Sequence, residues 1–166
     1  MATAKTLDDL FLDTLKDIYY AEKQILRALP KMARAAQSEV GKAGFLKHRD
    51  ETHGQIERLE QVFEIIGKPA RGKTCEAIQG IIAEADEIIE EFEGSAALDA
   101  GLISSAQAVE HYEIARYGTL IAWAKQLGHK QAVILLQQNL AEEEATDKKL
   151  TELALSAANA KGTKAA

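Results

Sequence analysis

The chain has 166 residues, enough for one domain with a substantial core. Its formal net charge of −6 does not favour nucleic acid or an anionic membrane as a partner, and its single cysteine excludes an internal disulfide and fits a reducing compartment. No apolar run approaches the roughly 18 residues of a membrane span, and the first residues lack the apolar segment of a secretory signal, so we expect a soluble, cytoplasmic protein.

The first predicted helix runs from about residue 6 to the mid-30s. Thr6 is a suitable N-cap, and two aspartates follow it in the first turn, where acidic side chains are favourable. Pro30 lies inside the apolar pattern and predicts a kink or an early end. Glu22 falls at the centre of the apolar stripe, a position that charged side chains usually avoid.

The second predicted helix covers about residues 38–66 and ends at Gly67, a suitable C-cap. At about 100° per residue, three polar side chains fall near the centre of its inner face and one carboxylate falls at the edge. The central residues are His48, Thr52 and Gln55, and the residue at the edge is Glu51.

A connection of about 30 residues follows, with a loop at 67–75 and an amphipathic helical segment at about 74–92. Connections of roughly two to eight residues are usual in a bundle, so this one should carry the chain from one end of the bundle to the other. The second and third long helices should then run parallel. The third is predicted at about 97–127 and the fourth at about 129–157, and 158–166 is expected to be a flexible tail after a single domain at 1–157.

The third and fourth helices also carry polar groups in their apolar stripes. Glu110, Glu113 and Tyr117 follow the three-four spacing of the third helix, and Glu143 and Asp147 follow that of the fourth. Lysine and arginine lie mostly on the outer faces. The chain therefore predicts an all-α four-helix bundle with a long crossover that carries an extra short helix, and with carboxylates facing inward.

Buried carboxylates need compensation, because removing an ion from water costs several kcal/mol. One solution is a network of protonated, hydrogen-bonded carboxyl groups with strongly raised pKa values. The other is metal, since hard cations prefer oxygen ligands with an occasional imidazole. Glutamates from several helices facing one another are typical of a carboxylate-bridged di-metal site.

Four segments resemble the YciE/YciF family of ferritin-like bacterial proteins, and the resemblance extends from about residue 6 to 155. The segments are IYYAEKQIL, HRDETHGQIERLEQVF, QAVEHYEIARYGTL and LAEEEATDKKLTELA, of which the last two are the most specific. The resemblance implies a ferritin-like fold akin to rubrerythrin and Dps, a homodimer, and an association with bacterial stress responses.

The resemblance also implies roles for individual residues. Glu22 matches the lone carboxylate that the first helix supplies to ferritin-like di-iron sites. Glu110 and Glu113 match the third-helix carboxylates of the rubrerythrin-like version. Glu51 and Glu143 match the glutamates of the two Glu-x-x-His motifs, whose carboxylates usually bridge the metals.

The chain departs from this pattern at both histidines. Gly54 and Thr146 stand where the two Glu-x-x-His motifs would place them. One position further on are Gln55 and Asp147, both on the inner face. His48, one turn before the motif of the second helix, is either a ligand or a core histidine hydrogen-bonded to a neighbour.

These observations predict a centre for two metal ions, with iron the first choice and manganese or zinc the alternatives. The expected ligands are Glu22, His48, Glu51, Glu110, Glu113, Glu143 and Asp147, with Thr52, Gln55 and Tyr117 behind them. The predicted activity is oxidation of Fe(II) with peroxide or oxygen in a stress response. The alternatives are a non-enzymatic structural stress protein and an interaction scaffold that uses the helix at 74–92.

Overall fold

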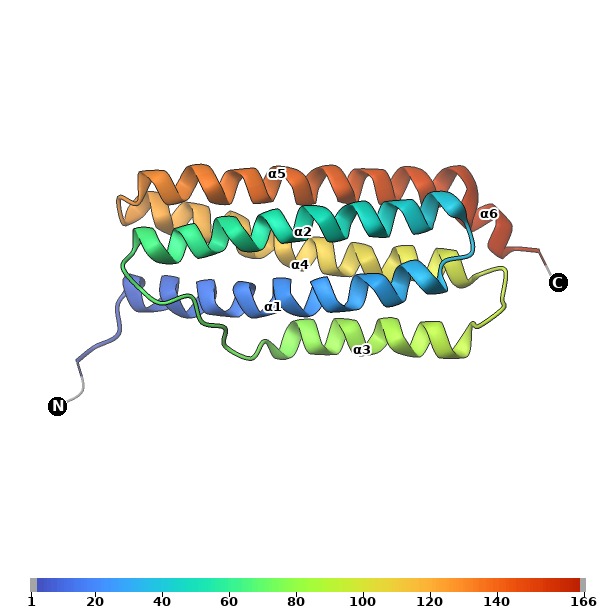
Figure 1. Cartoon of the computed structure of the whole chain (residues 1–166), viewed down its shortest axis with the longest axis horizontal. Coiled ribbons are helices and arrows are strands. Elements are labelled where there is room, and N and C mark those ends of the chain that lie inside the picture. Colours follow the sequence, from blue (N-terminus) through green and yellow to red (C-terminus); the bar gives the residue numbers. More distant parts are fainter. Residues whose placement is uncertain (1–2, 165–166) are drawn as a thin grey trace.

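The structure, a computed structural model, describes residues 3–164 and is helical throughout that range apart from its connections (Figure 1). No helix within it is both long enough and apolar enough to cross a membrane. The elements are α1 (Leu7–Ala35), α2 (Glu39–Ile65), α3 (Glu76–Glu91), α4 (Leu98–Gln126), α5 (Lys130–Leu153), a π-helical segment η1 (Ala154–Ala158) and α6 (Asn159–Gly162).

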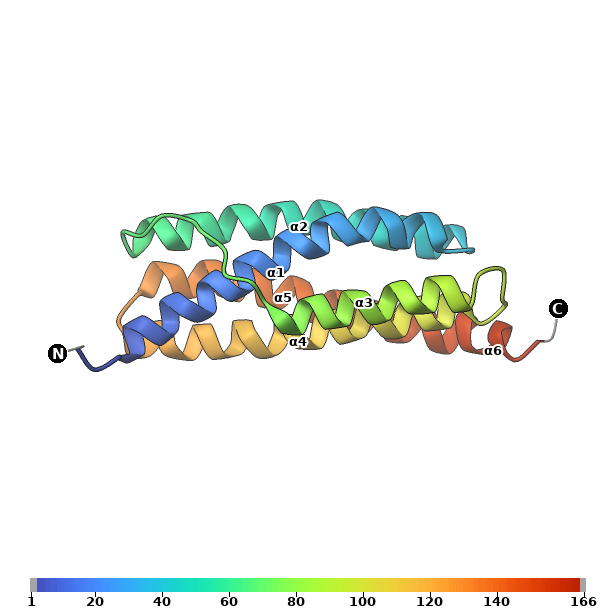
Figure 2. The same cartoon turned by 90° about the horizontal axis from the view of Figure 1, so that it is seen from below.

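Four long helices form the bundle as two antiparallel hairpins, α1 with α2 and α4 with α5 (Figures 1 and 2). Figure 1 shows α2 and α4 running in the same direction, opposite to α1, α3 and α5. The predicted all-α bundle with a long crossover and an extra helix between α2 and α4 is therefore confirmed.

The crossover covers one side of the bundle. The chain leaves the end of α2, returns along the molecule, and enters α3, which packs against α1 and α4 (Figure 1). The Sγ atom of the buried Cys75 accepts a hydrogen bond from the backbone N–H of Ile78 and lies 3.0 Å from the hydroxyl of Tyr112, which also donates to Asp17. These contacts fix the start of α3 against α4 and α1.

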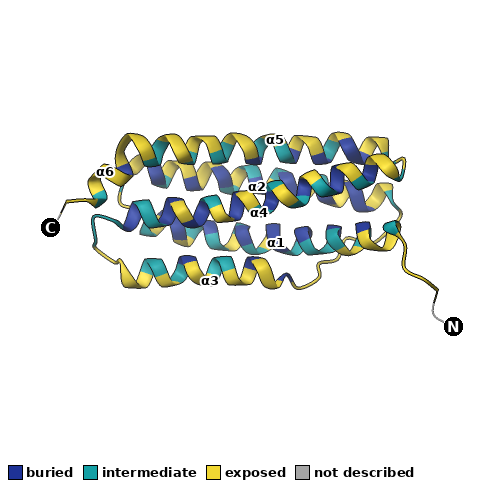
Figure 3. Ribbon diagram, turned by 180° about the vertical axis from the view of Figure 1, so that it is seen from behind, coloured by how far each residue is buried: buried dark blue, intermediate teal, exposed yellow. Residues whose placement is uncertain are grey.

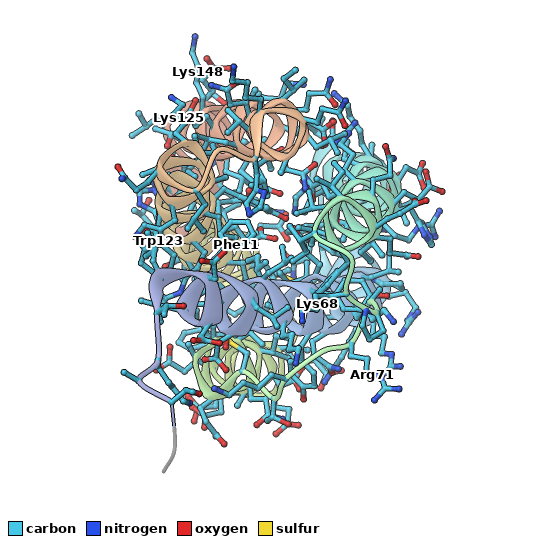
Figure 4. The ribbon with its side chains drawn as sticks, turned by 90° about the vertical axis from the view of Figure 1, so that its left-hand side faces the viewer. Phe11, Lys68, Arg71, Trp123, Lys125 and Lys148 are labelled. Carbon is cyan, nitrogen blue, oxygen red and sulfur yellow. The ribbon has the colours of Figure 1, made fainter. Side chains whose placement is uncertain are left out.

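The core consists of the inward stripes of the long helices, which Figure 3 shows as bands of buried residues along each ribbon. Figure 4 looks along the bundle from the end where α1 begins. In this view Phe11 points inward, whereas Lys125 and Lys148 point outward and Lys68 and Arg71 lie on the crossover. The position of the apolar stripes is as the three-four spacing predicts.

Local signals set most of the helix ends. Thr6 forms a capping box with Asp9 at the start of α1, and Ser38 accepts a hydrogen bond at the start of α2. Gly67 has a φ of 67° just after α2, a left-handed conformation that glycine adopts without strain. The early end that Pro30 suggested is wrong, because α1 continues past it to Ala35.

The C-terminal segment differs from the expected flexible tail at 158–166. The helix continues through η1 and α6 as far as Gly162, while residues 165–166 lie outside the described part of the chain. Ala158 is buried, and a Cβ added to Gly162 would lie 3.3 Å from the Cα of Ala97. The close approach of α6 to the start of α4 therefore depends on this glycine.

Asp99, in the first turn of α4, joins the two hairpins. Its carboxylate accepts hydrogen bonds from the backbone N–H groups of Gln37, at 2.7 Å, and Ser38, at 2.9 Å. These donors belong to the connection between α1 and α2. A buried side chain on the second hairpin thus satisfies backbone donors at a turn of the first.

We expect Asp99→Ala to lower the free energy of unfolding by about 2 kcal/mol, because two charge-assisted hydrogen bonds are lost. Urea denaturation measures the loss. The control is Asp86→Ala, which removes a half-exposed ion pair with Lys31 and should cost at most about 1 kcal/mol. Equal losses in the two variants would show that Asp99 has no special role in joining the hairpins.

Candidate metal centre

Four side chains from three helices meet in the middle of the bundle: His48 of α2, Glu110 and Glu113 of α4, and Glu143 of α5. One potential ligand atom from each lies within 4.8 Å of those of the others, and all four side chains are buried. The three-four spacing on each helix places its polar group on the inner face, and the packing of the two hairpins brings the groups together.

The first helix adds Glu22, which is fully buried beside Glu113. Tyr117, one turn after Glu113 on α4, donates a hydrogen bond of 2.5 Å to Oε1 of Glu22. The amide of Asn139 donates to the same phenol oxygen at 3.2 Å. Glu22 therefore sits in a fixed orientation at the α1 side of the cluster.

His48 supplies the positive charge that the helix patterns did not predict. Its Nε2 atom lies 2.9 Å from Oε1 of Glu110, and its Nδ1 atom lies 3.7 Å from Oε2 of Glu51. Burial lowers the pKa of this imidazole, but its interactions with Glu110, Glu51 and Glu22 outweigh that effect and raise the pKa to about 10. In the metal-free protein His48 is a cation among carboxylates.

Three carboxyl groups of the cluster, those of Glu22, Glu113 and Glu143, have raised pKa values, which favour their neutral forms. Burial, followed by the charges of the neighbouring glutamates, holds the pKa values of Glu113 and Glu143 well above their ordinary range. Burial also raises the pKa of Glu22 to about 7, although hydrogen bonds from Glu113 and Tyr117 oppose the shift. One imidazolium cannot balance four carboxylates, so protons or metal must supply the remaining charge.

Several buried polar atoms of the cluster have no hydrogen-bond partner apart from the other groups of the cluster, which natural proteins usually avoid unless an ion or shared protons compensate. Within the described chain these include one oxygen of Glu22, both ring nitrogens of His48, one oxygen of Glu110, and both oxygens of Glu113 and Glu143. Carboxylate oxygens with an imidazole nitrogen form a donor set that suits iron, manganese or zinc. The residues present therefore fit a metal ion.

Two predicted ligands lie outside this cluster. Glu51 is at its edge with 27% of its side chain exposed, next to His48 and 3.5 Å from Nζ of Lys47. Asp147 is 23% exposed and its Oδ1 atom faces Nε2 of His111, at 3.1 Å. The structure brings Glu51 to the rim and places Asp147 on the α4 side of α5, away from the other ligands.

The three residues predicted behind the ligands have different surroundings. Thr52 donates from its hydroxyl to the backbone oxygen of His48 in its own helix. Gln55 donates to a carboxylate oxygen of Glu142, at 3.1 Å. Of the three, Tyr117 alone is hydrogen-bonded to a carboxylate of the cluster, that of Glu22.

Sequence reasoning missed a second network beside the cluster, formed by Arg58, Asn139 and Glu142. Arg58 donates to the amide oxygen of Asn139 at 2.9 Å and lies 2.8 Å from a carboxylate oxygen of Glu142. Asn139 is fully buried one turn before Glu143. The sequence did offer one signal for this network, because the polar side chain of Asn139 falls in the apolar stripe of α5. The network links α2 to α5 and holds Asn139 against Tyr117.

We expect metal-free protein to lose stability as pH rises from about 5 to about 8. Ionised Glu22 costs stability, and this cost is absent below its ordinary pKa of 4.5 and complete above its folded value of about 7. His48 acts in the same direction, because the stability from its raised pKa is complete below 6.5 and is lost as pH rises through about 10. Urea denaturation in the presence of a chelator measures the trend.

Glu22→Gln tests the cause, since the amide cannot ionise. The variant should have a flatter pH profile between pH 4.5 and about 7, whereas Glu90→Gln, on the exposed face of α3, should keep the wild-type profile. A stability that rises over this range in chelator would contradict the assignment of the buried charge.

Known proteins with this fold give the site its context. The chain is 50% identical to YciF of Escherichia coli (strain K12) over 158 residues, 95% of each chain. The crystal structure of that stress protein superposes with a TM-score of 0.89 and covers 94% of this chain and 99% of the other. YcfI from Rhodopseudomonas palustris, for which a structural role has been suggested, is 52% identical with a TM-score of 0.87, covering 89% of this chain and 94% of the other.

Residues 6–163, almost the whole chain, match one protein family, described as a domain of unknown function, DUF892. The match includes every residue of the cluster and of the network around it. The expected resemblance to YciF and its ferritin-like bundle is confirmed by the sequence identity and by the superposition. The chain is a member of the DUF892 family.

Proposed function

We propose that the buried cluster binds two metal ions, iron before manganese or zinc, and that the protein oxidises Fe(II) with peroxide or oxygen in a bacterial stress response. One observation carries the proposal. Four buried ligand groups, three carboxylates and one imidazole, converge to within 4.8 Å of one another. Carboxylate oxygens together with an imidazole nitrogen are ligands that suit iron, manganese or zinc.

The residues divide between two positions. His48, Glu110, Glu113 and Glu143 would hold one ion, because their ligand atoms already lie together. Glu22 would hold the second, with Glu113 shared between the two because it contacts both Glu22 and Glu143. Glu51, at the rim beside His48, is available to the first position if its side chain turns inward.

The surrounding residues would control orientation and charge. Bound iron would supply one electron per ion to an oxidant, and anionic oxygen ligands favour the higher oxidation state. Tyr117 fixes Glu22 by donating a hydrogen bond, and Asn139 fixes Tyr117 in turn. Arg58, which is paired with Glu142, donates a hydrogen bond to Asn139, so the orientation of Glu22 depends on contacts from three helices.

The second candidate is a structural stress protein without redox activity. Two observations favour it: the raised pKa values of Glu113 and Glu143 let protons replace metal, and both expected histidines are absent, with Gly54 and Thr146 in their places. A structural role has also been suggested for YcfI, the relative from Rhodopseudomonas palustris. The homodimer and the cytoplasmic location stay predictions under either candidate.

Glu143→Gln should lower the affinity for Fe(II) by more than the roughly 10- to 100-fold that loss of an outer-shell partner costs, because it removes a ligand. The matched control is Glu144→Gln, which changes the adjacent, exposed residue of α5 and leaves the cluster intact. Elemental analysis after anaerobic loading and dialysis measures the bound metal, and stopped-flow absorbance measures Fe(II) oxidation by peroxide.

The redox proposal requires stoichiometric metal binding and peroxide consumption by the wild-type chain and by Glu144→Gln, with loss of both in Glu143→Gln. Metal binding without faster oxidation than free Fe(II) would favour the structural candidate with metal as a stabiliser. Wild-type protein that stays substoichiometric in metal after loading would rule out the metal centre.

Glu113→Gln separates metal from protons as the source of stability. Because burial and the charges of Glu22 and Glu110 raise the pKa of Glu113 well above its ordinary range, this carboxyl is driven toward its neutral form without metal, and the amide should change the stability of metal-free protein little. Metal at about 100 times its dissociation constant should stabilise the wild type by about 2.7 kcal/mol, and this gain should disappear in the variant. Thermal unfolding with and without chelator measures both effects.

A further inference from the structure

Two spaces reach the cluster from different sides of the bundle. Between α2 and α5, a groove of about 410 Å³ is lined in part by charged side chains of both signs, among them Lys47 and Glu51. Beneath α3, between α1 and α4, lies a pocket of about 20 Å³. His48 and Glu110 line both spaces, so the groove and the pocket both adjoin the cluster.

Helix α3 forms the outer wall of the pocket and is held on both of its flanks (Figure 1). On the α1 flank, Lys31 forms an ion pair of 2.6 Å with the half-exposed Asp86, which lines the outer end of the pocket. On the α4 flank, a Cβ added to Gly101 would lie 2.7 Å from Cγ2 of Ile88, so the two helices are in close contact there. The pocket is therefore a space between packed helices.

The size of the pocket limits its contents to very small molecules. A water molecule needs roughly 10–15 Å³ of such space, so about 20 Å³ holds about one molecule of that size. Protein interiors are packed as densely as organic crystals, so a larger guest would have to displace the side chains of the wall. Water, hydrogen peroxide and dioxygen are all small enough to be considered.

Apolar side chains make up most of the wall. Ser105 adds one hydroxyl, which is fewer than the roughly two to four partners that a buried water molecule needs. The charged groups lie at the two ends, with Asp86 toward the surface and His48 and Glu110 at the cluster. The apolar wall residues include Ile25, Leu29 and Met32 of α1, Ile82 and Ala85 of α3, and Ala106 and Val109 of α4.

This lining distinguishes among the three small molecules. Water and hydrogen peroxide give up hydrogen bonds when they leave solvent, and an apolar wall does not replace them. Dioxygen is apolar and has no strong hydrogen bonds to give up. Apolar cavities in proteins stay dry and take up apolar guests such as xenon. The chemistry of the wall therefore favours dioxygen.

We propose that the pocket beneath α3 binds dioxygen beside His48 and Glu110, and that hydrogen peroxide reaches the cluster through the polar groove between α2 and α5. The redox role of the pocket rests on the proposed function. In that reaction one dioxygen molecule accepts two electrons from two Fe(II) ions and two protons from solvent, which gives hydrogen peroxide and two Fe(III) ions. Binding of dioxygen itself needs no metal.

Dissolved dioxygen is the probe, applied under pressure to metal-free protein with labelled isoleucine methyl groups. Because dioxygen is paramagnetic, it shifts and broadens the nuclear magnetic resonance signals of the methyl groups beside which it binds. We expect saturable shifts at Ile25 and Ile82, which line the pocket. Much smaller shifts are expected at Ile18, which is also buried on α1 but does not line the pocket.

Ala85→Leu fills the pocket from α3 and changes no residue of the cluster. The dioxygen-dependent shift at Ile25 should fall roughly tenfold, because the leucine takes the space of the ligand. The matched control is Ala83→Leu, on the exposed face of the same helix, which should keep the wild-type shift. Ala28→Leu fills the pocket from α1 and should act as Ala85→Leu does, so the test does not depend on the folding of one variant. Melting curves confirm folding of each variant.

Stopped-flow absorbance of the iron-loaded proteins tests the route to the cluster. Ala85→Leu should slow Fe(II) oxidation by dioxygen roughly tenfold and leave oxidation by peroxide as in the wild type, because only the apolar pocket is filled. Equal slowing with both oxidants, or no slowing with dioxygen, would show that dioxygen does not depend on this pocket and would overturn the proposal.

The methyl shifts decide the binding site independently of iron. Equal shifts at Ile18, Ile25 and Ile82, or shifts that Ala85→Leu leaves unchanged, overturn the dioxygen site. Failure of the wild-type protein to bind iron would refute the proposed function alone, because the shifts in metal-free protein still show whether the pocket binds dioxygen.

Discussion

Four glutamate side chains are buried around the imidazole of His48, and the internal arrangement of the bundle follows from this excess of negative charge. Each carboxylate that enters the core loses several kcal/mol of hydration, and the imidazolium compensates only one of them. Protons can neutralise the rest, at the cost of raised pKa values, and cations can do so by direct bonding. Neutralisation by protons and neutralisation by a cation both require the four long helices to keep their positions relative to one another, because the carboxylates and the imidazole come from different helices.

Helix periodicity was sufficient to find the centre of the cluster. Glu22, Glu110, Glu113 and Glu143 interrupt apolar stripes at regular spacing, and a regular helix fixes the direction in which each side chain points. The crossover length also predicted the parallel α2 and α4, because a connection of that size has to return along the bundle. These inferences need only the periodicity of one helix or the length of one connection, and both can be read from the sequence.

Periodicity failed where a side chain is positioned by a neighbouring helix. Asp147 is four residues after Glu143, about 40° further around α5. There it meets His111 of α4, which holds it at the edge of the bundle. Arg58 has a long side chain that reaches from the edge of α2 to Asn139. The helical wheel of one helix contains no information about such pairings, and the same holds for the packing of α6 against α4.

The crossover makes the two sides of the centre unequal. The two hairpins meet on two sides of the bundle, where α2 packs against α5 and α1 packs against α4. Because α2 and α4 are parallel, the connection must cross the length of the molecule, and α3 closes the entrance between α1 and α4. The chain's connectivity thus covers one side of the centre with a helix and leaves the side between α2 and α5 without one.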